Sequence, residues 1–579
     1  MPGKFLRHNS GKITQNIRFL LIFGKTNKTM TRIIECVPNY SEGRDRSVID
    51  AIVAAISSVK EVKVLNVDPG EATNRTVVTF VGPPEAVVEA AFRGSAKAKE
   101  KIDMRLHHGA HPRSGSTDVL PLIPISGITL EECAALARKL AERLYKELGI
   151  PCYCYEAAAF KPERKNLAVC RAGEYEALPE KMADPERKPD FGGSFDETAA
   201  RTGASNVGAR NFLIAVNFNL NTTSTRRAMA VAFDVREKGR KVGDEWIPGT
   251  LKGCKAIGWY IDEYGIAQVS MNITDIDATP LHVAFDEVSR AAAARGLRVT
   301  GAEIVGLVPK RVLVEAGRYY LEKQQRSLGI SEEEIIKIAV KSMSLDDLKP
   351  FDPREKVIEY LMEDPAEMAV KERLVRMSIK GFVAETASES PAPGGGSVSA
   401  VMGALGAALA TMVANLSSHK RGWDERWKEF SDVAEKGQAL VKELTALVDE
   451  DTAAFNRIMD VFAMPKGTPE EKAARDKAME EATFYAASVP LKTMEASLKA
   501  LPLALEMAQK GNPASASDAG VAALAATAAV RGAAMNVRIN AAGLKDGASA
   551  APLLERASQI EAEALALQDK VLEAVGLSK

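Results

Sequence analysis

The pattern of apolar and polar residues changes character beyond the middle of the chain. Up to about Pro353, short apolar runs alternate with segments of helical period. The first part predicts strands at 33–37, 62–67, 76–81, 119–125 and 152–155, helices at 48–59, 84–102 and 130–148, and a turn at Pro69-Gly70. The βαββαβ order with which these elements begin is typical of a split unit, whose antiparallel sheet carries both helices on one face.

The same order then recurs along the chain. Strands are predicted at 212–219, 256–260, 267–272 and 299–308, and helices at 225–238 and 279–295. Two successive units predict two similar ferredoxin-like subdomains, which we place at 30–211 and 212–361. Because ligands favour the interfaces between domains, we expect a cleft near residue 211.

Strand patterns stop beyond Pro353, and the remaining chain has helical period. Residues 362–370 are acidic and aperiodic, which is typical of a linker, and residues 371–579 are rich in alanine. The sequence therefore predicts an α/β (α+β) half followed by an all-α helical-bundle domain. Residues 1–29 match neither pattern and are predicted to be a disordered N-terminal extension.

Composition narrows the classes of partner. The 76 basic and 77 acidic residues leave a net charge of -1, which favours neither a nucleic acid nor an anionic membrane surface as partner. The six cysteines contain no CxxC pair and follow no secretory signal, so we expect reduced thiols and a cytoplasmic location. Cys152 and Cys154 alternate on one face of a strand, which indicates core packing.

Two stretches are long enough to raise the question of a membrane. Residues 398–416 carry no charge, and residues 521–535 carry only Arg531. Alanine, glycine and serine dominate both, so their transfer into lipid is only weakly favourable. Buried helices that pack closely through small residues explain both stretches, and we expect no membrane insertion.

A histidine cluster is the first candidate for chemistry, with His107, His108 and His111 in one short segment. No carboxylate or cysteine stands at helical spacing to complete a metal site. Glycine and proline break the segment into a loop, and Pro112 restrains His111 to an extended backbone. We favour acid–base catalysis by His111, with Arg113 holding a substrate carboxylate. A metal site and a loop with no role are the alternatives.

Two more loops carry hydrogen-bonding side chains at the ends of strands. One contains Asn39, and the other runs from Asp68 through Asn74 and Arg75. In a βαββαβ unit both loops can approach a common edge of the sheet. Ordinary turn chemistry accounts for each loop taken alone.

In the helical half, two polar loops lead into apolar helices. Gly394, Gly395, Gly396 and Ser397 begin one helix, where exposed backbone N–H groups would suit an anionic or heteroaromatic ligand. The run lacks the lysine of a phosphate loop, and a plain turn explains it equally well. In the second loop, residues 511–518, Ser517 or Asp518 is the expected N-cap.

Two carboxylates stand out on the helix predicted around 440–462. Asp451 lies on the apolar stripe of this helix, and Asp449 lies about 200° away. A carboxylate that faces a bundle core is costly unless it is paired or used. Catalysis and a structural ion pair are both open on spacing alone.

These segments, in this order, resemble the formiminotransferase-cyclodeaminase family of folate enzymes in histidine degradation. The resemblance extends over residues 30–579. It rests on Glu35-Cys-Val-Pro-Asn-Tyr-Ser-Glu-Gly43, Thr73-Asn-Arg-Thr76, His111-Pro-Arg113 with Gly115 and Asp118, Arg171-Ala-Gly-Glu-Tyr-Glu176, Gly208-Ala-Arg210, Ala392-Pro-Gly-Gly-Gly-Ser-Val398, Leu447-Val-Asp-Glu-Asp451 with Ala454-Phe455, and Gly511-Asn512 with Ser517-Asp518.

The resemblance implies two reactions. The first moves the formimino group of N-formimino-L-glutamate to N5 of tetrahydrofolate. The second closes the ring with N10 and releases ammonia, which gives 5,10-methenyltetrahydrofolate. The family's transferase base falls on His111, and Asp68 matches a carboxylate near it. The cyclodeaminase carboxylate falls on Asp451 or Asp449, and the helical stripe favours Asp451.

The expected contacts to folate and substrate form a larger set. They are Asn39, Asn74, Arg75, Arg113, Phe191, Gly192, Gly193, Ser194, Arg210, Gly394, Gly395, Gly396, Ser397 and Asp518. Tetrahydrofolate, with or without a polyglutamate tail, is the implied co-substrate. The resemblance also implies a homo-oligomer built from dimers, and no metal is expected.

Departures and alternatives follow from the same resemblance. Ala110, Ser114 and His108 differ from the pattern expected around the His-Pro-Arg motif, which leaves the local substrate preference open. The bundle also resembles the related methenyltetrahydrofolate cyclohydrolases. A transferase fused to a cyclohydrolase, or a folate-binding scaffold with an inactive site, are therefore the alternatives.

Overall fold

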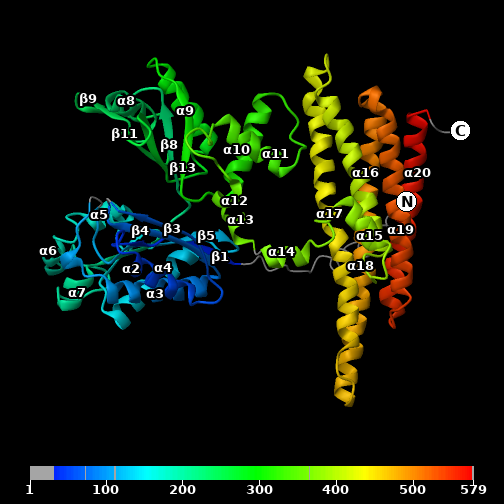
Figure 1. Cartoon of the computed structure of the whole chain (residues 1–579), viewed down its shortest axis with the longest axis horizontal. Coiled ribbons are helices and arrows are strands. Elements are labelled where there is room, and N and C mark those ends of the chain that lie inside the picture. Colours follow the sequence, from blue (N-terminus) through cyan, green and yellow to red (C-terminus); the bar gives the residue numbers. More distant parts are fainter. Residues whose placement is uncertain (1–31, 72, 110–111, 364, 577–579) are drawn as a thin grey trace, which may run out of the picture.

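A computed structural model describes residues 32–576 apart from 72, 110, 111 and 364. An α/β part and a separate bundle of long helices are visible side by side (Figure 1). Two features of the sequence, the N-terminal extension at 1–29 and His111, lie outside the described residues.

The first subdomain is built on a seven-stranded sheet. Its spatial order is β3, β4, then β1 and β2 together, then β5, β7 and β6. The strands are β1 (Ile33–Cys36), β2 (Asn39–Tyr40), β3 (Lys63–Gly70), β4 (Arg75–Gly82), β5 (Thr117–Ser126), β6 (Cys152–Glu156) and β7 (Ser205–Ala209).

Helices cover one face of this sheet, as Figure 1 shows. They are α2 (Arg46–Ser57), α3 (Pro84–Lys101) and α4 (Leu130–Leu148). α4 keeps its predicted bounds because a Thr129–Glu132 capping box begins it and the left-handed Gly149 ends it. Short elements complete the subdomain: η1 (Met104–Leu106), η2 (Pro162–Lys165), α5 (Leu167–Arg171), α6 (Leu178–Ala183) and α7 (Glu197–Thr202).

Two expectations about this sheet are wrong. The sheet is mixed, because β7 pairs in parallel with both β5 and β6 and had not been predicted from its small and polar residues. The turn expected at Pro69-Gly70 lies further on, because β3 continues to Gly70 and the chain reverses before Asn74, whose φ is 48°.

The second subdomain has the expected ferredoxin-like sheet, with the antiparallel order β11-β12-β8-β13. The strands are β8 (Ile214–Leu220), β11 (Cys254–Ile261), β12 (Ile266–Ile273) and β13 (Val299–Val305), with α8 (Thr225–Val235) and α9 (Leu281–Ala293) packed on one face. A small ribbon of β9 (Arg240–Val242) and β10 (Glu245–Ile247) projects from it. After it come α10 (Lys310–Lys323), α11 (Glu332–Ser342), α12 (Pro353–Lys356), α13 (Ile358–Met362) and α14 (Pro365–Lys371). α14 makes part of the predicted linker helical.

The C-terminal part is a helical bundle, as the pattern predicted. It contains α15 (Ile379–Thr386), α16 (Gly395–Ser418), η3 (Asp424–Arg426), α17 (Trp427–Phe462), α18 (Pro469–Lys510), η4 (Pro513–Ser515), α19 (Ala516–Ala541) and α20 (Gly547–Ala574). Its core is made largely of alanine, leucine and valine. α16 and α19 approach so closely that a Cβ on Gly406 would lie 2.9 Å from the Ala522 carbonyl oxygen.

The two long apolar stretches of the sequence are helices of the bundle. Within the described ranges, two helical segments are long and apolar enough to cross a membrane, Gly395–Ser418 and Pro513–Ala541. In each, 56% of the apolar window is buried inside the protein. Both therefore contribute to the core of the bundle.

Candidate functional sites

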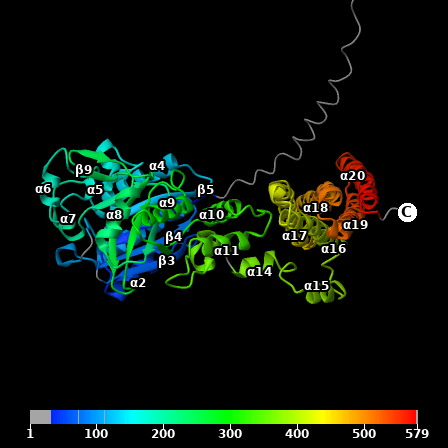
Figure 2. The same ribbon diagram turned by 90° about the horizontal axis from the view of Figure 1, so that it is seen from above.

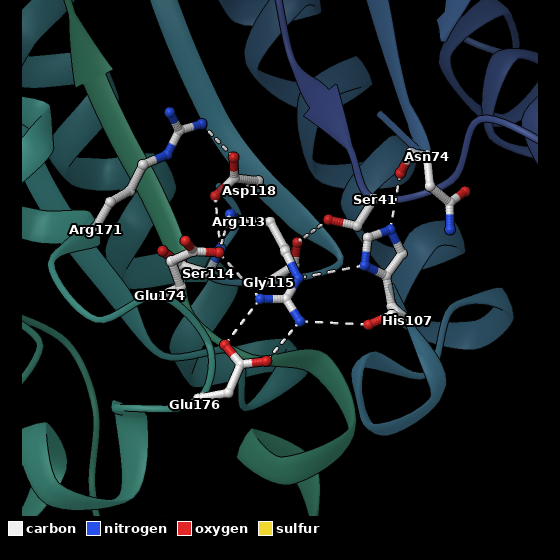
Figure 3. A network of polar contacts seen from close by, with 10 residues as sticks. All are labelled: Ser41, Asn74, His107, Arg113, Ser114, Gly115, Asp118, Arg171, Glu174 and Glu176. Atoms are coloured by element: carbon white, nitrogen blue, oxygen red, sulfur yellow. Dashed lines mark hydrogen bonds and ion pairs between the residues drawn. The ribbon is translucent and has the colours of Figure 1, made fainter. Parts of the chain in front are cut away.

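Three loops of the first subdomain meet at Asn74. Its Oδ1 accepts from the Gly43 N–H (3.0 Å), and its Nδ2 donates to the His108 carbonyl (3.0 Å). Its own carbonyl accepts from Nε2 of His107 (2.8 Å; Figure 3). The loops that the sequence left as separate turns are therefore joined to the histidine loop. Asn74 is buried and its amide is occupied by protein groups, which gives it a positioning role.

Glycine is required where these loops touch. A Cβ on Gly43 would lie 2.4 Å from the Gly70 carbonyl oxygen, and a Cβ on Gly109 would lie 2.2 Å from that of Thr73. Larger residues would push the loops apart, because backbone atoms cannot yield as a flexible side chain can. The loop arrangement thus depends on these two positions.

Arg113 is buried and its guanidinium is occupied by carboxylates of the protein. Nη1 and Nη2 donate to the two oxygens of Glu176 (2.8 and 2.7 Å), and Nη1 also donates to Glu174 (3.1 Å). These hydrogen bonds lower the pKa of Glu176. Nε donates weakly to Nδ1 of His107 (3.4 Å; Figure 3). The sequence suggested that Arg113 binds a carboxylate of the substrate. In the structure its guanidinium binds the carboxylate of Glu176 instead.

A second charged pair lies deeper in the same region. Asp118 is fully buried, accepts from the Ser114 N–H (2.9 Å) and forms an ion pair with Arg171 (Figure 3). Among the described residues, several buried polar atoms in this region have no hydrogen-bond partner: Arg171 Nε in α5, Ser114 Oγ, Ser116 Oγ and Thr117 Oγ1 at the start of β5, and Ser205 Oγ and Asn206 Oδ1 in β7. Buried polar groups are normally satisfied, so this cluster is suited to a polar ligand or to water. The site prediction had missed Asp118 and Arg171, although both stand in its motifs.

Four predicted residues share the sheet face opposite helices α2, α3 and α4. Directly paired strand residues project to one face, and Asn39 and Asp68 both pair with Val77. Arg75 lies two residues before Val77, and Arg210 follows β7 by alternation. Burial lowers the pKa of Arg75, while the charges of Asp118 and Asp68 raise it. This polar face looks toward the second subdomain (Figures 1 and 2).

The glycine-rich segment Phe191 to Ser194 lies elsewhere. Phe191 exchanges backbone hydrogen bonds with Cys152 (2.7 and 3.1 Å) on the outer edge of β6. Three strand spacings, about 14 Å, separate it from β5. Gly192, Gly193 and Ser194 follow at the surface, so the structure does not bring this segment to the Asp118 cluster.

Metal ligation was the alternative for the histidine loop. Among the described residues, which omit 110 and 111, no three histidine, cysteine or acidic side chains gather as a metal group. Both ring nitrogens of His107 are engaged by Asn74 and Arg113.

In the bundle, Asp451 meets the glycine run at the start of α16. Ser397 Oγ donates to Asp451 Oδ2 (3.1 Å) and to the Val448 carbonyl (2.9 Å). A Cβ on Gly396 would lie 2.1 Å from Asp451 Oδ1, so only glycine admits the carboxyl. Burial raises the pKa of Asp451, and hydrogen bonds from Ser397 oppose that rise. Two features that the sequence singled out separately form one site.

Asp449 has different partners. Its Oδ1 accepts from the Leu374 N–H (2.8 Å) and its Oδ2 from the Val375 N–H (3.2 Å). Both carboxylate oxygens therefore anchor the chain that enters the bundle. The structure supports a structural role for Asp449 and leaves Asp451 beside the glycine run.

Asp518 lies far from this site within one chain. Neither Ser517 nor Asp518 is the N-cap that was expected, because α19 begins at Ala516 after Ser515. A Cβ on Gly395 would lie 3.3 Å from Asn536, near the other end of α19. At 1.5 Å per residue, Asp518 is about 27 Å from Asn536.

The α/β half carries a polar sheet face, and the bundle carries a buried acid against the start of a helix. Polar groups gathered in this way are typical of enzymes. Family models agree with this division. The model described as formiminotransferase domain, N-terminal subdomain, matches residues 33–210, and the formiminotransferase domain model matches 215–363. The model described as formiminotransferase-cyclodeaminase matches 378–559.

Curated relatives give the particular family. The chain is 43% identical to mouse formimidoyltransferase-cyclodeaminase over 517 residues, which are 89% of this chain and 94% of the relative. It is 41% identical to glutamate formimidoyltransferase of Streptococcus pyogenes over 51% of this chain and 94% of that protein. It is 41% identical to methenyltetrahydrofolate cyclohydrolase of Methylorubrum extorquens over 34% of this chain and 95% of that protein. The chain belongs to the formimidoyltransferase-cyclodeaminase family of enzymes.

Proposed function

We infer that the chain catalyses two successive steps on folate. The α/β half transfers the formimino group from N-formimino-L-glutamate to N5 of tetrahydrofolate and releases glutamate. The bundle then cyclises 5-formiminotetrahydrofolate to 5,10-methenyltetrahydrofolate and releases ammonia. Tetrahydrofolate, with or without a polyglutamate tail, is the carrier between the steps.

The contact between Asp451, Ser397 and Gly396 is the observation that carries the second step. In cyclisation N10 attacks the formimino carbon, and the bond from this carbon to the terminal nitrogen breaks. A carboxylate can take the proton from N10 and deliver it to that nitrogen, which leaves as ammonia. Burial raises the pKa of Asp451, which brings the acid closer to the range where it can both accept and donate.

For the transfer step we assign the base to His111, which the family motif supports. A neutral imidazole would take the N5 proton and then protonate the departing glutamate nitrogen. Asn74 and Arg113 fix the neighbouring parts of its loop. Asp68, Arg75 and Asn39 are the groups on the polar face that we assign to the substrates.

One assay tests both halves. The full chain is incubated with formiminoglutamate and tetrahydrofolate, and glutamate, ammonia and methenyl-folate absorbance are followed. His111→Ala should stop glutamate release but still cyclise added 5-formiminotetrahydrofolate, and Asp451→Asn should do the reverse. Asp449→Asn should lower the melting temperature and leave the folded protein active. If cyclisation persists in Asp451→Asn and is lost in folded Asp449→Asn, Asp449 is the catalytic carboxylate and Asp451 the structural one.

A cyclohydrolase is the second candidate for the bundle. The similarity to methenyltetrahydrofolate cyclohydrolase over 95% of that relative favours it. The same acid could activate water against the methenyl bridge. The test adds 5,10-methenyltetrahydrofolate and follows its absorbance. A decrease with the wild type, and no decrease with Asp451→Asn, would establish that activity.

We further propose a homo-oligomer built from dimers, in which α16 and α19 contribute one interface. Uncharged apolar side chains are exposed along both helices: Leu405, Met412 and Leu416 on α16, and Val521, Leu524, Met535 and Ile539 on α19. Leu405→Glu with Leu524→Glu should lower the molecular mass measured by light scattering. Val383→Glu on exposed α15 is the matched control, and an unchanged mass in the double variant would exclude this interface. A cytoplasmic location is also proposed, since all six cysteines are free and buried thiols.

A further inference from the structure

The side chain of Asn536 on α19 lies against the first turn of α16, beside Asp451. A Cβ on Gly395 would lie 3.3 Å from Asn536 Nδ2 and 3.6 Å from its Oδ1. The next residue, Gly396, is the one that meets Asp451. Successive residues of a helix project about 100° apart. Asp451 and Asn536 therefore flank the start of α16 on adjacent sides.

One hydrogen bond fixes how the Asn536 amide is turned. Its Nδ2 donates to the Gly532 carbonyl, one turn earlier on α19 (2.9 Å). A carbonyl oxygen only accepts, so the amide nitrogen must lie on that side. Oδ1 then points elsewhere, and the described residues provide no donor for it. Since Oδ1 is not among the buried unpaired atoms of that part of the chain, a ligand can reach it.

The space beside this turn is open. Gly394 and Gly395 are exposed, and Asp451 and Asn536 are only half-buried. A Cβ on Gly394 would meet nothing within 4 Å. Because neighbouring Cβ positions of a helix are close together, the Asp451 and Asn536 oxygens are at most about 11 Å apart. One substrate can therefore contact both side chains from the open side.

The substrate inferred for the bundle offers Asn536 a hydrogen-bond donor. The formimino group on N5 is an amidinium, and its terminal nitrogen carries N–H groups and no lone pair. A formyl group on N5 has an oxygen in the same place, which only accepts. N10 and the terminal nitrogen come to share the formimino carbon, so contacts from Asp451 to N10 and from Asn536 to that nitrogen together need about 8 Å.

We propose that Asn536 Oδ1 accepts a hydrogen bond from the terminal formimino nitrogen and so selects formimino over formyl folates. Asn536 holds this nitrogen and takes no proton. Asp451 still carries the proton from N10 to the nitrogen, whose bond to the formimino carbon breaks as ammonia leaves. The proposal rests on the cyclodeaminase activity inferred above.

The test compares 5-formiminotetrahydrofolate with 5-formyltetrahydrofolate in the full chain. Ammonia release gives the KM of the first, and inhibition of that release gives the Ki of the second. In the wild type the Ki should exceed the KM at least about 10-fold, because two acceptors would face each other. Asn536→Leu should raise the KM about 10-fold and leave the Ki within about 2-fold, so the two constants become similar. An unchanged ratio of Ki to KM in folded Asn536→Leu would overturn the proposal.

Asn536→Asp separates recognition from support of the helix. Its carboxylate keeps an acceptor for the amidinium but cannot donate to the Gly532 carbonyl. The ratio of Ki to KM should therefore stay at about 10 or more. A ratio that falls in Asn536→Asp would contradict the proposal, and this variant decides the case in which Asn536→Leu does not fold.

Asn540→Leu is the matched control. This asparagine lies one turn further along α19 and donates to the Ala486 carbonyl on α18 (2.7 Å). The variant should keep the wild-type ratio of Ki to KM. An equal fall in Asn536→Leu and Asn540→Leu would show a general effect on the bundle and overturn the proposal. A wild type that releases no ammonia from 5-formiminotetrahydrofolate would instead overturn the cyclodeaminase function itself.

Discussion

At the scale of single residues, the burial of the Glu35 carboxyl should make the free energy of unfolding depend on pH. The pKa of Glu35 is about 7 in the folded chain against 4.5 for an unperturbed glutamate. The stabilising contribution of the protonated acid is complete below pH 4.5 and is lost as pH rises through 7. The ionised form then costs up to about 3 kcal/mol.

Glu35→Gln should therefore stabilise the transferase half at high pH. The variant lacks the ionisation, so its melting temperature should exceed that of the wild type at about pH 8 and match it near pH 4.5. Differential scanning calorimetry at the two pH values, without folate, measures the difference. An equal gap at both values would show that the carboxyl is solvated in the folded chain.

Gly396 offers a second residue-scale prediction. In Gly396→Ala the new Cβ would overlap the Asp451 carboxyl at 2.1 Å, so the acid or the start of α16 must move. We expect a loss of stability of about 1–3 kcal/mol, and of cyclisation, with formimino transfer preserved. Chemical denaturation and the ammonia assay measure both effects.

Gly394→Ala is the control for this stability change. Its Cβ would meet nothing within 4 Å, so the denaturation midpoint should stay at the wild-type value. Wild-type cyclisation in Gly396→Ala would mean that Asp451 does not need its place at the helix start.

At the scale of elements, the histidine loop is held by a chain of contacts rather than by its own sequence. Arg113 joins it to Glu174 and Glu176, which follow α5, and Asn74 joins it to the turn between β3 and β4. The sequence predicted that Pro112 restrains the loop locally. These long-range contacts add a framework that local patterns do not contain.

Arg113→Lys tests this framework. Lysine cannot bond both oxygens of Glu176 in a fork, so the loop should loosen and transferase kcat should fall by about 10- to 100-fold. Glutamate release measures the change, and cyclisation of added 5-formiminotetrahydrofolate should be unaffected. Arg105→Lys, whose ion pairs with Asp103 and Glu197 are exposed, should have little effect. A higher KM for formiminoglutamate at unchanged kcat would restore Arg113 as a substrate-binding residue.

At the scale of the whole molecule, one loop docks the α/β part on the bundle (Figure 1). The Leu328 N–H donates to Ser431 Oγ on α17 (3.0 Å), and Asn415 on α16 donates to the Gly329 carbonyl (2.9 Å). Arg318 and Glu435 form an ion pair beside them (2.7 Å). The contact fixes how the two halves face each other.

Gly329→Ala should weaken that docking. A Cβ at Gly329 would lie 2.3 Å from the Ala434 backbone, so the loop must withdraw from α17. Trypsin should then cut the connection between the halves, at Lys371 to Arg376, several-fold faster, as seen in the time course on gels. Gly547→Ala, whose Cβ meets nothing within 4 Å, is the matched control. Equal cleavage in all three proteins would show that the loop contact does not hold the halves together.

The sequence by itself determined the fold class, the order of most elements and the place of Asp451 on an apolar stripe. These depend on periodicity and capping, which are local: α4 kept its bounds through Thr129 and Gly149. The short strand β7 had no such signal, so the parallel part of the sheet could not be predicted.

Only the tertiary structure decided which groups are partners. In the structure Arg113 forms an ion pair with Glu176, and Asp449 accepts a hydrogen bond from the backbone of Leu374. Asp451 lies against Gly396, and Asp518 lies at the far end of α19 from this site. Glu35 stands in the sequence as one residue of a motif, and its burial follows only from the sheet, in which β1 lies between β4 and β5. The physical reason is that a side chain's charge state and role depend on residues distant in sequence, whose positions no local pattern specifies.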